Sequence, residues 1–377
     1  MNILFGTPYY KPYFGGIERV IEQLSQVYRS QGHSTSVITT KWEFPRIFHT
    51  EWSSVVEYEE ARVYRIHTIP NRTIPFFQAP LVWLNISQLH STLDDIKPDV
   101  IILMSDKWIV GNFLLLRWAM KNNVPVIYSL SFHTLSFKQH ILKPINRYLT
   151  NRSNMVHVIT EKEKCAVKDA YNTKDELLQV IPWGANTNDN TERILQSGEF
   201  NIISVGRISH HKGQLITARI FQQALIEKRT QYTMIGTVED AEVAKEIRTL
   251  RLPKNKSISI TGHISDEEMD RLYRRADLFV LSPEYEAFGL VFIEALSRGV
   301  PVLTHDVGAI REVIGECESV NIVSAYDEHA FIKEVEKYSA LSNDKRNELS
   351  DIARSFIKDR FDWEKTAKKF LENIHTS

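Results

Sequence analysis

The sequence of 377 residues has little cysteine: it contains only Cys165 and Cys317, which lie far apart in the chain. Two such cysteines cannot build a disulfide framework or a tetrahedral zinc set, which excludes a small disulfide scaffold and a zinc domain. A reducing compartment, the cytoplasm, follows as the default location. A strong excess of one charge is also missing, because the formal net charge is −1, and this balance argues against a nucleic-acid partner.

Long hydrophobic runs are absent as well. The longest one, Trp108 to Leu116, contains Gly111 and Asn112 and is far shorter than the ~20 residues that span a bilayer. The amino terminus turns polar soon after Phe5 and lacks the basic residues of a signal peptide, so we interpret it as a first strand. These absences predict a protein that is either soluble or peripherally bound to a membrane.

The chain has enough apolar residues for two domains. Hydrophobic residues make up 43% of the sequence. A chain of 377 residues is too long for one ordinary core. Buried-strand runs alternate with helical patterns in both halves, which predicts an α/β fold of two doubly wound, Rossmann-like domains. We place the first domain at 1–183 and the second at 184–360. Helices are expected, among other places, over 81–96, 137–152 and 214–228.

Two carboxylates stand around a strand-loop-helix junction in the second half. Leu278–Leu281 has the pattern of a buried strand, and helical spacing resumes at Gly289. The free amides and the dipole of a helix start favour an anion such as a diphosphate. Glu294, in the second turn, needs donors if it is buried, and the vicinal hydroxyls of a ribose supply two. Glu286, in the loop, is placed to accept hydrogen bonds from a transferred sugar.

Two cations and two glycines stand at similar junctions. Arg207 ends the predicted strand 200–206 and Lys212 precedes the next helix, so the two side chains are suited to neutralise a diphosphate. From spacing alone, a surface pair of cations is an equally good interpretation. Gly15 and Gly16 follow the first strand, where backbone can approach a ligand closely, although a plain tight turn is the commoner explanation.

One histidine and one basic helix complete the candidates in the first half. His133 stands where a predicted strand ends, a position that points into the same crevice as the glycines, and His140 is the alternative. A purely structural histidine is nevertheless common. In the predicted helix 137–152, basic residues alternate with apolar ones, which suits packing on the protein's own core or, less often, contact with an anionic membrane.

In their order these motifs resemble the retaining glycosyltransferases of family 4, which have the GT-B fold and include glycogen-synthase-like and phosphatidylinositol-mannosyltransferase-like enzymes. The segments that carry the resemblance are Gly15–Arg19, Ile181–Thr187, Gly206–Gly213, Glu286–Glu294 and Gly299–Val302. Trp183, Asn186, His211 and Ala309 depart from the family pattern. The segment 361–377 resembles the family's closing helix, which crosses back to the first domain.

The resemblance implies a role for each candidate. Catalytic roles fall on Glu286, His133, Arg207 and Lys212, with Glu286 orienting the donor sugar. Glu294 would hold the ribose, and main-chain groups of Gly262, His263 and Ile264 would contact the base. The residues expected to bind substrate are Gly15, Gly16, Arg207, Lys212, Gly262, His263, Ile264, Glu286, Ala287, Phe288, Gly289, Leu290 and Glu294.

The implied reaction transfers a hexose-type sugar from a nucleoside-diphosphate sugar to a hydroxyl of a saccharide or lipid-linked acceptor, with retention of anomeric configuration. The sequence contains no Asp-x-Asp, so we expect no metal and no other cofactor; Arg207 and Lys212 would stabilise the departing diphosphate instead. The expected location is the cytoplasm, at the cytoplasmic face of the membrane if the basic helix binds lipid. Two other interpretations stay open: an inactive homologue that serves as a binding subunit, and a sugar-nucleotide epimerase or phosphorylase of the same fold.

Overall fold

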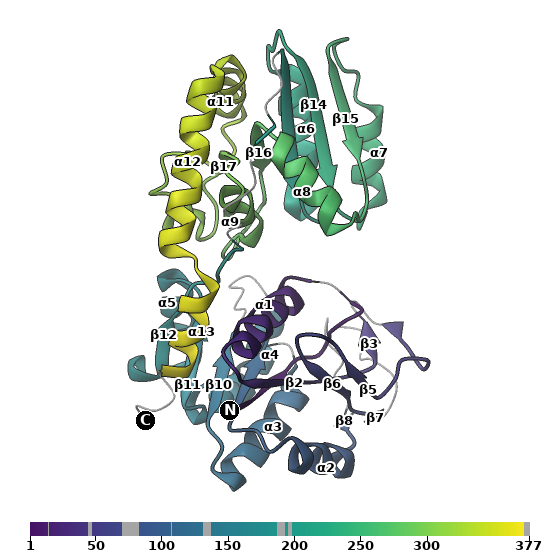
Figure 1. Ribbon diagram of the computed structural model, residues 1–377, viewed down its shortest axis with the longest axis vertical. Coiled ribbons are helices and arrows are strands. Elements are labelled where there is room, and N and C mark those ends of the chain that lie inside the picture. Colours follow the sequence, from purple (N-terminus) through teal and green to yellow (C-terminus); the bar gives the residue numbers. More distant parts are fainter. Residues whose placement is uncertain are drawn as a thin grey trace. The chain divides into compact units, whose positions relative to one another are not determined.

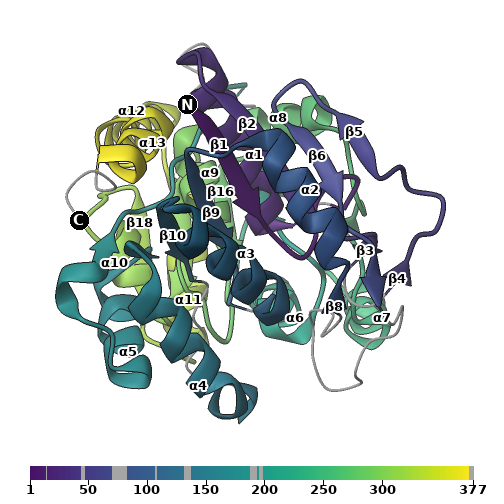
Figure 2. The same cartoon turned by 90° about the horizontal axis from the view of Figure 1, so that it is seen from below.

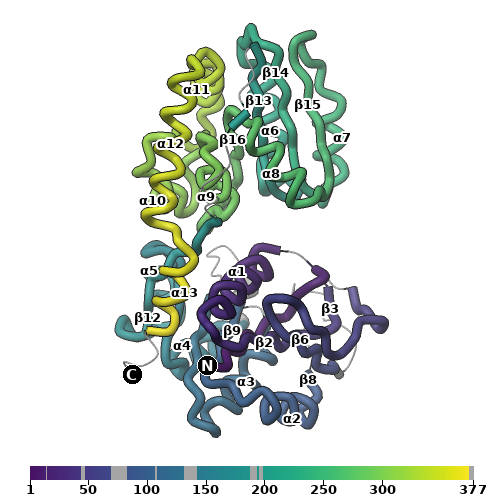
Figure 3. Tube along the Cα trace, viewed as in Figure 1, coloured from purple at the N-terminus to yellow at the C-terminus, as the bar shows by residue number. Residues whose placement is uncertain are grey.

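The computed structural model describes residues 1–13, 15–43, 47–69, 83–106, 108–130, 137–186, 193–194 and 198–372. The chain forms two compact units: Met1–Trp183 together with Trp363–Ser377, and Gly184–Asp362. Figure 1 labels most helices and strands of both units, and Figure 3 traces the chain through them. Each unit has one main sheet covered by helices and therefore its own hydrophobic core.

The sheet of the first unit has eight strands in the order β12-β11-β10-β9-β1-β2-β6-β5. All neighbours are parallel except β5 and β6, which are antiparallel. The strands are β1 Asn2–Gly6, β2 Ser34–Thr39, β5 Val55–Glu57, β6 Arg62–Arg65, β9 Val100–Met104, β10 Val126–Ser129, β11 Met155–Val158 and β12 Leu178–Val180. All five residues of β9 are buried, which explains its unbroken apolar run.

Helices cover both faces of this sheet. They are α1 Gly16–Ser30, α2 Ile86–Ile96, α3 Ile109–Asn122, α4 Phe137–Arg152, α5 Glu161–Tyr171 and α13 Trp363–Glu372, with a 3-10 turn η1 at Asp175–Leu177. Figure 2 shows α2 and α3 in front of the strands and α1 behind them. Leu4 and Ile101 from the strands share one core cluster with Leu89 of α2 and Leu115 of α3.

The C-terminal helix α13 belongs to the first unit, although nearly two hundred residues separate it from the rest of that unit. The hydroxyl of Tyr28 on α1 donates to the carbonyl oxygen of Ala367 at 3.2 Å. The ring of Phe370 is fully buried, with its centroid 4.5 Å from that of His157 and 5.9 Å from that of Trp183. The predicted return of the chain to the first domain is thus confirmed.

Two small ribbons lie outside the main sheets, and one of them corrects a prediction. They pair β3 Trp42–Glu43 with β4 Ile47–Phe48, and β7 Thr68–Ile69 with β8 Trp83–Leu84. The helix predicted from residue 81 was therefore wrong at its start. Helix α2 begins at Ile86 because Asn85 is its N-cap: the side-chain oxygen of Asn85 accepts a hydrogen bond from the Gln88 amide at 3.0 Å.

The second unit has a six-stranded parallel sheet in the order β15-β14-β13-β16-β17-β18. The strands are β13 Glu199–Val205, β14 Arg229–Ile235, β15 Lys256–Ile260, β16 Leu278–Leu281, β17 Val302–His305 and β18 Val320–Val323. The helices are α6 Gln214–Gln223, α7 Ala241–Thr249, α8 Asp266–Arg275, α9 Leu290–Ser297, α10 Ile310–Ile314, α11 Glu328–Ala340 and α12 Asn343–Arg360, with a 3-10 turn η2 at His210–Lys212. Both sheets confirm the predicted α/β fold.

Helix α6 ends at Gln223, five residues before the predicted end at Lys228. The sequence offers no helix breaker there. The ammonium group of Lys256, on β15, donates to the carbonyl oxygens of Phe221 at 2.7 Å and Gln222 at 3.2 Å. A side chain from a neighbouring strand therefore satisfies the last carbonyls, which sequence periodicity does not reveal.

Candidate functional site

The predicted cation and carboxylate loops lie at a reversal of strand order in the second unit. From β13 the chain passes to β14 and β15 on one side, and then to β16 on the other side of β13. Open α/β sheets bind ligands at the carboxyl ends of their strands at such a point. Arg207 and Lys212 follow β13 and Glu286 follows β16, so the two loops leave from neighbouring strands.

Gln214, fully buried at the start of α6, fixes the loop after β13. Its side-chain oxygen accepts a hydrogen bond from the amide of Ser209 at 3.3 Å, and its side-chain nitrogen donates to the carbonyl of Arg207 at 2.9 Å. The preceding Gly213 has φ +69°, and a Cβ on it would lie 1.7 Å from the carbonyl oxygen of Ser282. Glycine is therefore needed twice, for the left-handed backbone and for the close approach of the two loops.

The loop after β17 fixes the backbone of Glu286. The amide of Ala309 donates to the Glu286 carbonyl at 3.0 Å, and a Cβ on Gly308, which has φ +58°, would lie 1.9 Å from the same oxygen. On the other side, Gly289 is the N-cap of α9 with φ +84°. The scaffold, rather than the side chain's own contacts, thus sets where Glu286 stands.

Lys212 and Glu286 touch although they are 74 residues apart in the sequence. The Lys212 Nζ lies 2.9 Å from the Glu286 Oε2, and the two side chains are 30% and 15% exposed. An ammonium group is a compact positive charge for a phosphate. A carboxylate can accept about four hydrogen bonds. Besides the hydrogen bond from the Lys212 ammonium group, Glu286 can therefore accept others from hydroxyl groups.

Arg207 has a carboxylate partner from the loop that follows the neighbouring strand β14. Its Nη1 lies 2.7 Å from the Oε1 of Glu239, and both side chains are about half exposed. The loops after β13, β14 and β15 contact one another through backbone: the amide of Gly236 donates to the Gly262 carbonyl at 3.0 Å, and a Cβ on Gly236 would lie 2.2 Å from the Gly206 oxygen. The predicted base-contacting segment from Gly262 to Ile264, with exposed His263, thus lies at the same edge.

Helix α9 presents one half-buried stripe. Leu290, Val291 and Glu294 are half-buried, whereas the residues that face the core, such as Phe292, are fully covered. Phe288 is 3% exposed and packs edge to face on Phe361 with 6.0 Å between ring centroids. The Phe288 side chain therefore serves packing, and among its neighbours Ala287 and Leu290 remain partly accessible. The amide of Phe292 donates to the Gly289 carbonyl at 2.9 Å, whereas the two amides before it, those of Leu290 and Val291, have no acceptor one turn back within their own helix.

In the first unit, the two predicted glycines follow β1, where the strand order also reverses. Gly15 is the N-cap of α1, and a Cβ on it would lie 2.5 Å from a carboxylate oxygen of Glu18. Glu18 is 6% exposed; burial raises its pKa to about 7, while hydrogen bonds from the Glu18 and Gly15 backbone oppose the rise. No role was predicted for Glu18. His133 lies outside the described residues, as does the side chain of His140.

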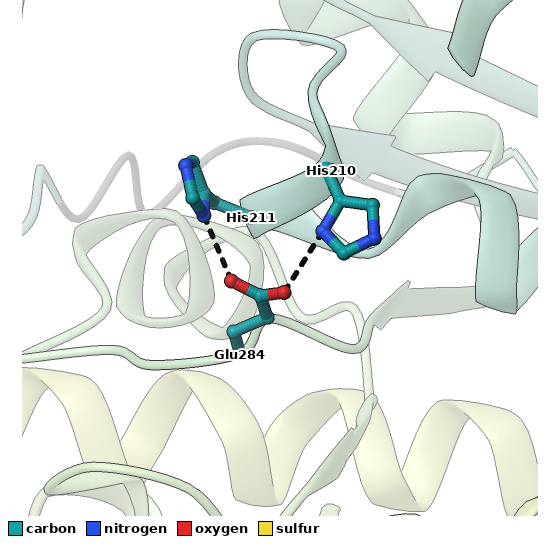
Figure 4. Close-up of side chains that lie close together, drawn as sticks. All are labelled: His210, His211 and Glu284. Carbon is teal, nitrogen blue, oxygen red and sulfur yellow. Dashed lines mark hydrogen bonds and ion pairs between the residues drawn. The ribbon is translucent and has the colours of Figure 1, made fainter.

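One cluster beside the site is not predicted from the sequence. The Nδ1 atoms of His210 and His211 each lie 2.8 Å from a different carboxylate oxygen of Glu284. Figure 4 shows both rings directed at that carboxylate. The histidine pair is visible in the sequence, but Glu284 is 73 residues away from His211 and stands on another loop. Within the described part of the chain, these three side chains form the one group able to hold a metal ion.

Comparison with known proteins finds relatives of the same architecture. The lipopolysaccharide 1,2-N-acetylglucosaminetransferase of Salmonella typhimurium is 25% identical over 200 residues, which cover 50% of this chain and 52% of that protein. The chain spans about half the length of the curated relatives that it matches first. Sucrose-phosphate synthase from Thermosynechococcus elongatus has a TM-score of 0.77 at 17% identity, covering 98% of this chain and 97% of that one.

A structure of Anabaena Alr3699/HepE in complex with UDP and glucose has a TM-score of 0.73 at 18% identity, covering 100% of this chain and 99% of the other. Likeness at such identities shows the fold, which is GT-B. Family models match both halves of the sequence: "Glycosyltransferase Family 4" matches residues 14–189, and "Glycosyl transferases group 1" matches residues 187–356. The predicted resemblance is confirmed, and the chain belongs to the group 1, family 4 glycosyltransferases.

Proposed function

We propose that this protein is a retaining glycosyltransferase that moves a hexose-type sugar from a nucleoside-diphosphate sugar to a hydroxyl acceptor. The contact between Lys212 and Glu286, at the strand-order reversal of the second unit, carries the proposal. It joins a cation suited to phosphate with a carboxylate suited to hydroxyls. A nucleotide sugar presents these two groups next to each other, because its anomeric carbon is bonded to the diphosphate.

The other residues of the second unit fit the rest of such a donor. Arg207, half exposed at the same edge, would exchange its contact with Glu239 for a bidentate contact with phosphate. The first-turn amides of α9 would complete the diphosphate site. Glu294, four residues into the same half-buried stripe, would accept hydrogen bonds from the ribose hydroxyls, and backbone groups of Gly262 to Ile264 would contact the base.

The proposed reaction breaks the bond between the anomeric carbon and the diphosphate oxygen through an oxocarbenium-like state. Lys212 and Arg207 stabilise the negative charge that develops on the diphosphate. The Glu286 carboxylate orients the sugar and stabilises its positive charge. The departing phosphate oxygen takes the proton of the acceptor hydroxyl, which attacks from the same face, so the configuration is retained.

A uridine nucleotide is the donor that the comparisons favour. The Anabaena protein of similar fold is described in complexes with UDP and glucose and with UDP-glucose. The Salmonella relative is named as an N-acetylglucosaminetransferase that acts on lipopolysaccharide. We therefore propose a UDP-hexose as donor and a saccharide, free or lipid-linked, as acceptor.

The first unit would hold the acceptor, and Gly15 and Gly16 would let a substrate approach the backbone closely. No helix among the described residues is long and apolar enough to cross a membrane. Helix α4 leaves Lys143, Arg147 and Arg152 exposed, together with Ile145, so we propose peripheral contact with anionic lipid there. Sedimentation with phosphatidylserine vesicles at low salt tests this contact, and no co-sedimentation contradicts it.

The test of the donor class is a calorimetric titration of the purified protein with UDP, GDP and ADP. We expect UDP to bind and the others to bind more weakly. A screen of nucleotide sugars for slow hydrolysis without acceptor then identifies the sugar. Failure to bind any of the three nucleotides would favour an inactive homologue over the proposed transferase.

A further inference from the structure

Two loops from neighbouring strands hold the cluster of His210, His211 and Glu284. The amide of Glu284 donates to the carbonyl of His211 at 3.0 Å, and the amide of Gly213 donates to the carbonyl of His210 at 3.0 Å. A Cβ on Gly213 would overlap the carbonyl of Ser282, so the loops touch backbone to backbone. The three side chains thus project from positions that are fixed independently of their own contacts.

The cluster has the donor set of a zinc site. Two imidazole nitrogens and a carboxylate suit Zn²⁺, whereas Mg²⁺ and Ca²⁺ prefer oxygen ligands alone. The donor atoms lie within 4.8 Å of one another. Tetrahedral ligands at 2.0–2.2 Å from Zn²⁺ stand about 3.4 Å apart, so donor atoms now 2.8 Å apart need to separate by about 0.6 Å, and a pair at the 4.8 Å limit needs to close by about 1.4 Å.

We propose that His210, His211 and Glu284 bind one Zn²⁺ ion, with water as the fourth ligand. His210 and His211 are 71% and 83% exposed and Glu284 is 42% exposed, so solvent reaches the open position. Each ring coordinates through Nδ1 in the neutral form that carries its proton on Nε2. In the metal-free protein, hydrogen bonds from the two imidazole rings to Glu284 replace the bonds from the three side chains to Zn²⁺.

The ion would brace the loops that carry the proposed donor site. Lys212 directly follows His211, and Glu286 stands two residues after Glu284, so a bond from each loop to one ion holds the Lys212–Glu286 pair together. This consequence rests on the proposed function, whereas Zn²⁺ binding does not. Bound Zn²⁺ therefore tightens UDP binding without taking part in sugar transfer.

The test uses the untagged chain of 377 residues, stripped of metal, in a Cys165→Ser background because a free, exposed thiol is a competing ligand type for Zn²⁺. Competition with a chromogenic chelator, without nucleotide, measures the Zn²⁺ affinity. We expect one ion per chain, undisturbed by excess Mg²⁺. His210→Gln, His211→Gln and Glu284→Gln each weaken binding at least tenfold, by analogy with the roughly 10- to 100-fold cost of lost metal-supporting groups.

His329→Gln is the matched control, because His329 is also exposed but lies on α11. The site is overturned if the parent protein does not bind Zn²⁺, or if His329→Gln weakens binding as much as the cluster variants do. Circular dichroism checks that each variant is folded. UDP affinity is then measured with and without Zn²⁺. An unchanged UDP affinity contradicts the proposal that the ion holds the two loops together. A protein that binds Zn²⁺ but no UDP contradicts the proposed transferase and leaves the zinc site supported.

Discussion

The contact between Lys212 and Glu286 predicts different losses for its two partners. Lys212→Ala removes a charged contact to phosphate worth roughly 1.5–3 kcal/mol, so UDP binding and turnover should both fall at least tenfold. Glu286→Gln should lower turnover at least tenfold but change UDP affinity little, because UDP lacks the sugar that Glu286 would contact. Initial rates with the donor sugar and calorimetry with UDP measure the two effects.

Lys345→Ala is the control for these variants. Lys345 and Glu348 also form a pair, at 2.6 Å, but on the exposed surface of α12. Breaking such a pair is worth at most about 1 kcal/mol of stability and should leave turnover unchanged. Near-normal turnover in a folded Lys212→Ala or Glu286→Gln variant would refute the roles assigned to the pair.

Glu18 predicts a pH dependence of stability in the first unit. Its pKa is raised by burial to about 7, from an ordinary value of 4.5 in the unfolded chain. Between these two values the folded state binds the extra proton, so the free energy of unfolding falls as pH rises from about 4.5 through 7. Glu18→Gln removes this loss, which is on the order of 3 kcal/mol. Urea denaturation of both proteins at several pH values measures it.

The comparison with the variant is needed because His157 acts in the opposite direction. Burial lowers the pKa of His157 from 6.5 to about 4. The stabilisation that follows from keeping this ring neutral is therefore complete above about pH 6.5 and is lost as pH falls towards 4. The His157 contribution is the same in both proteins, so it cancels when the free energy of unfolding of wild type is subtracted from that of Glu18→Gln. A difference that does not grow between pH 5 and pH 8 would show that Glu18 does not carry a raised pKa.

At the scale of elements, a substitution of Gly213 tests whether the site needs the close approach of the loops after β13 and β16. Gly213→Ala would place a methyl group 1.7 Å from the Ser282 oxygen, so the loops must part and Lys212 must leave Glu286. We expect a stability loss of about 2–4 kcal/mol, from a positive φ and overpacking together, and at least a tenfold loss of turnover. Thermal unfolding and initial rates measure these losses.

Gly198→Ala separates the two causes. Gly198 has φ +84°, yet among the described residues no atom lies within 4 Å of the position of a Cβ there. This variant should therefore lose only the roughly 1–2 kcal/mol of backbone strain and keep its turnover. If both glycine variants behaved alike, the contact between the loops would have no part in the site.

How far the sequence predicts these elements depends on how local their causes are. The strands and most helices follow from periodicity and caps, and the parallel sheets then bring the loops after β13 and β16 to one edge. The end of α6 does not follow, because Lys256 caps it from another strand. The contact of Glu284 with His210 and His211 does not follow either, since it depends on how two loops and three side chains meet.

At the scale of the whole molecule, the two units differ in how the chain builds them. The second unit is one continuous segment, Gly184–Asp362, whereas the first combines residues from both ends of the chain. Helix α13 buries Trp363 and Phe370 in the first unit. The first unit is therefore complete only when the last part of the chain has been made.

This difference predicts the behaviour of fragments. The segment 184–362 contains the whole core of its unit and the proposed donor residues, so it should unfold cooperatively and bind UDP. The segment 1–183 lacks α13, and loss of a buried Phe alone costs about 3–5 kcal/mol, so it should melt lower than the same segment with a 363–377 peptide added. Calorimetric scans of each fragment measure both expectations. A peptide that leaves the midpoint of 1–183 unchanged would show that the first unit does not need its returning helix, and an unfolded 184–362 would show that the donor unit does need the rest of the chain.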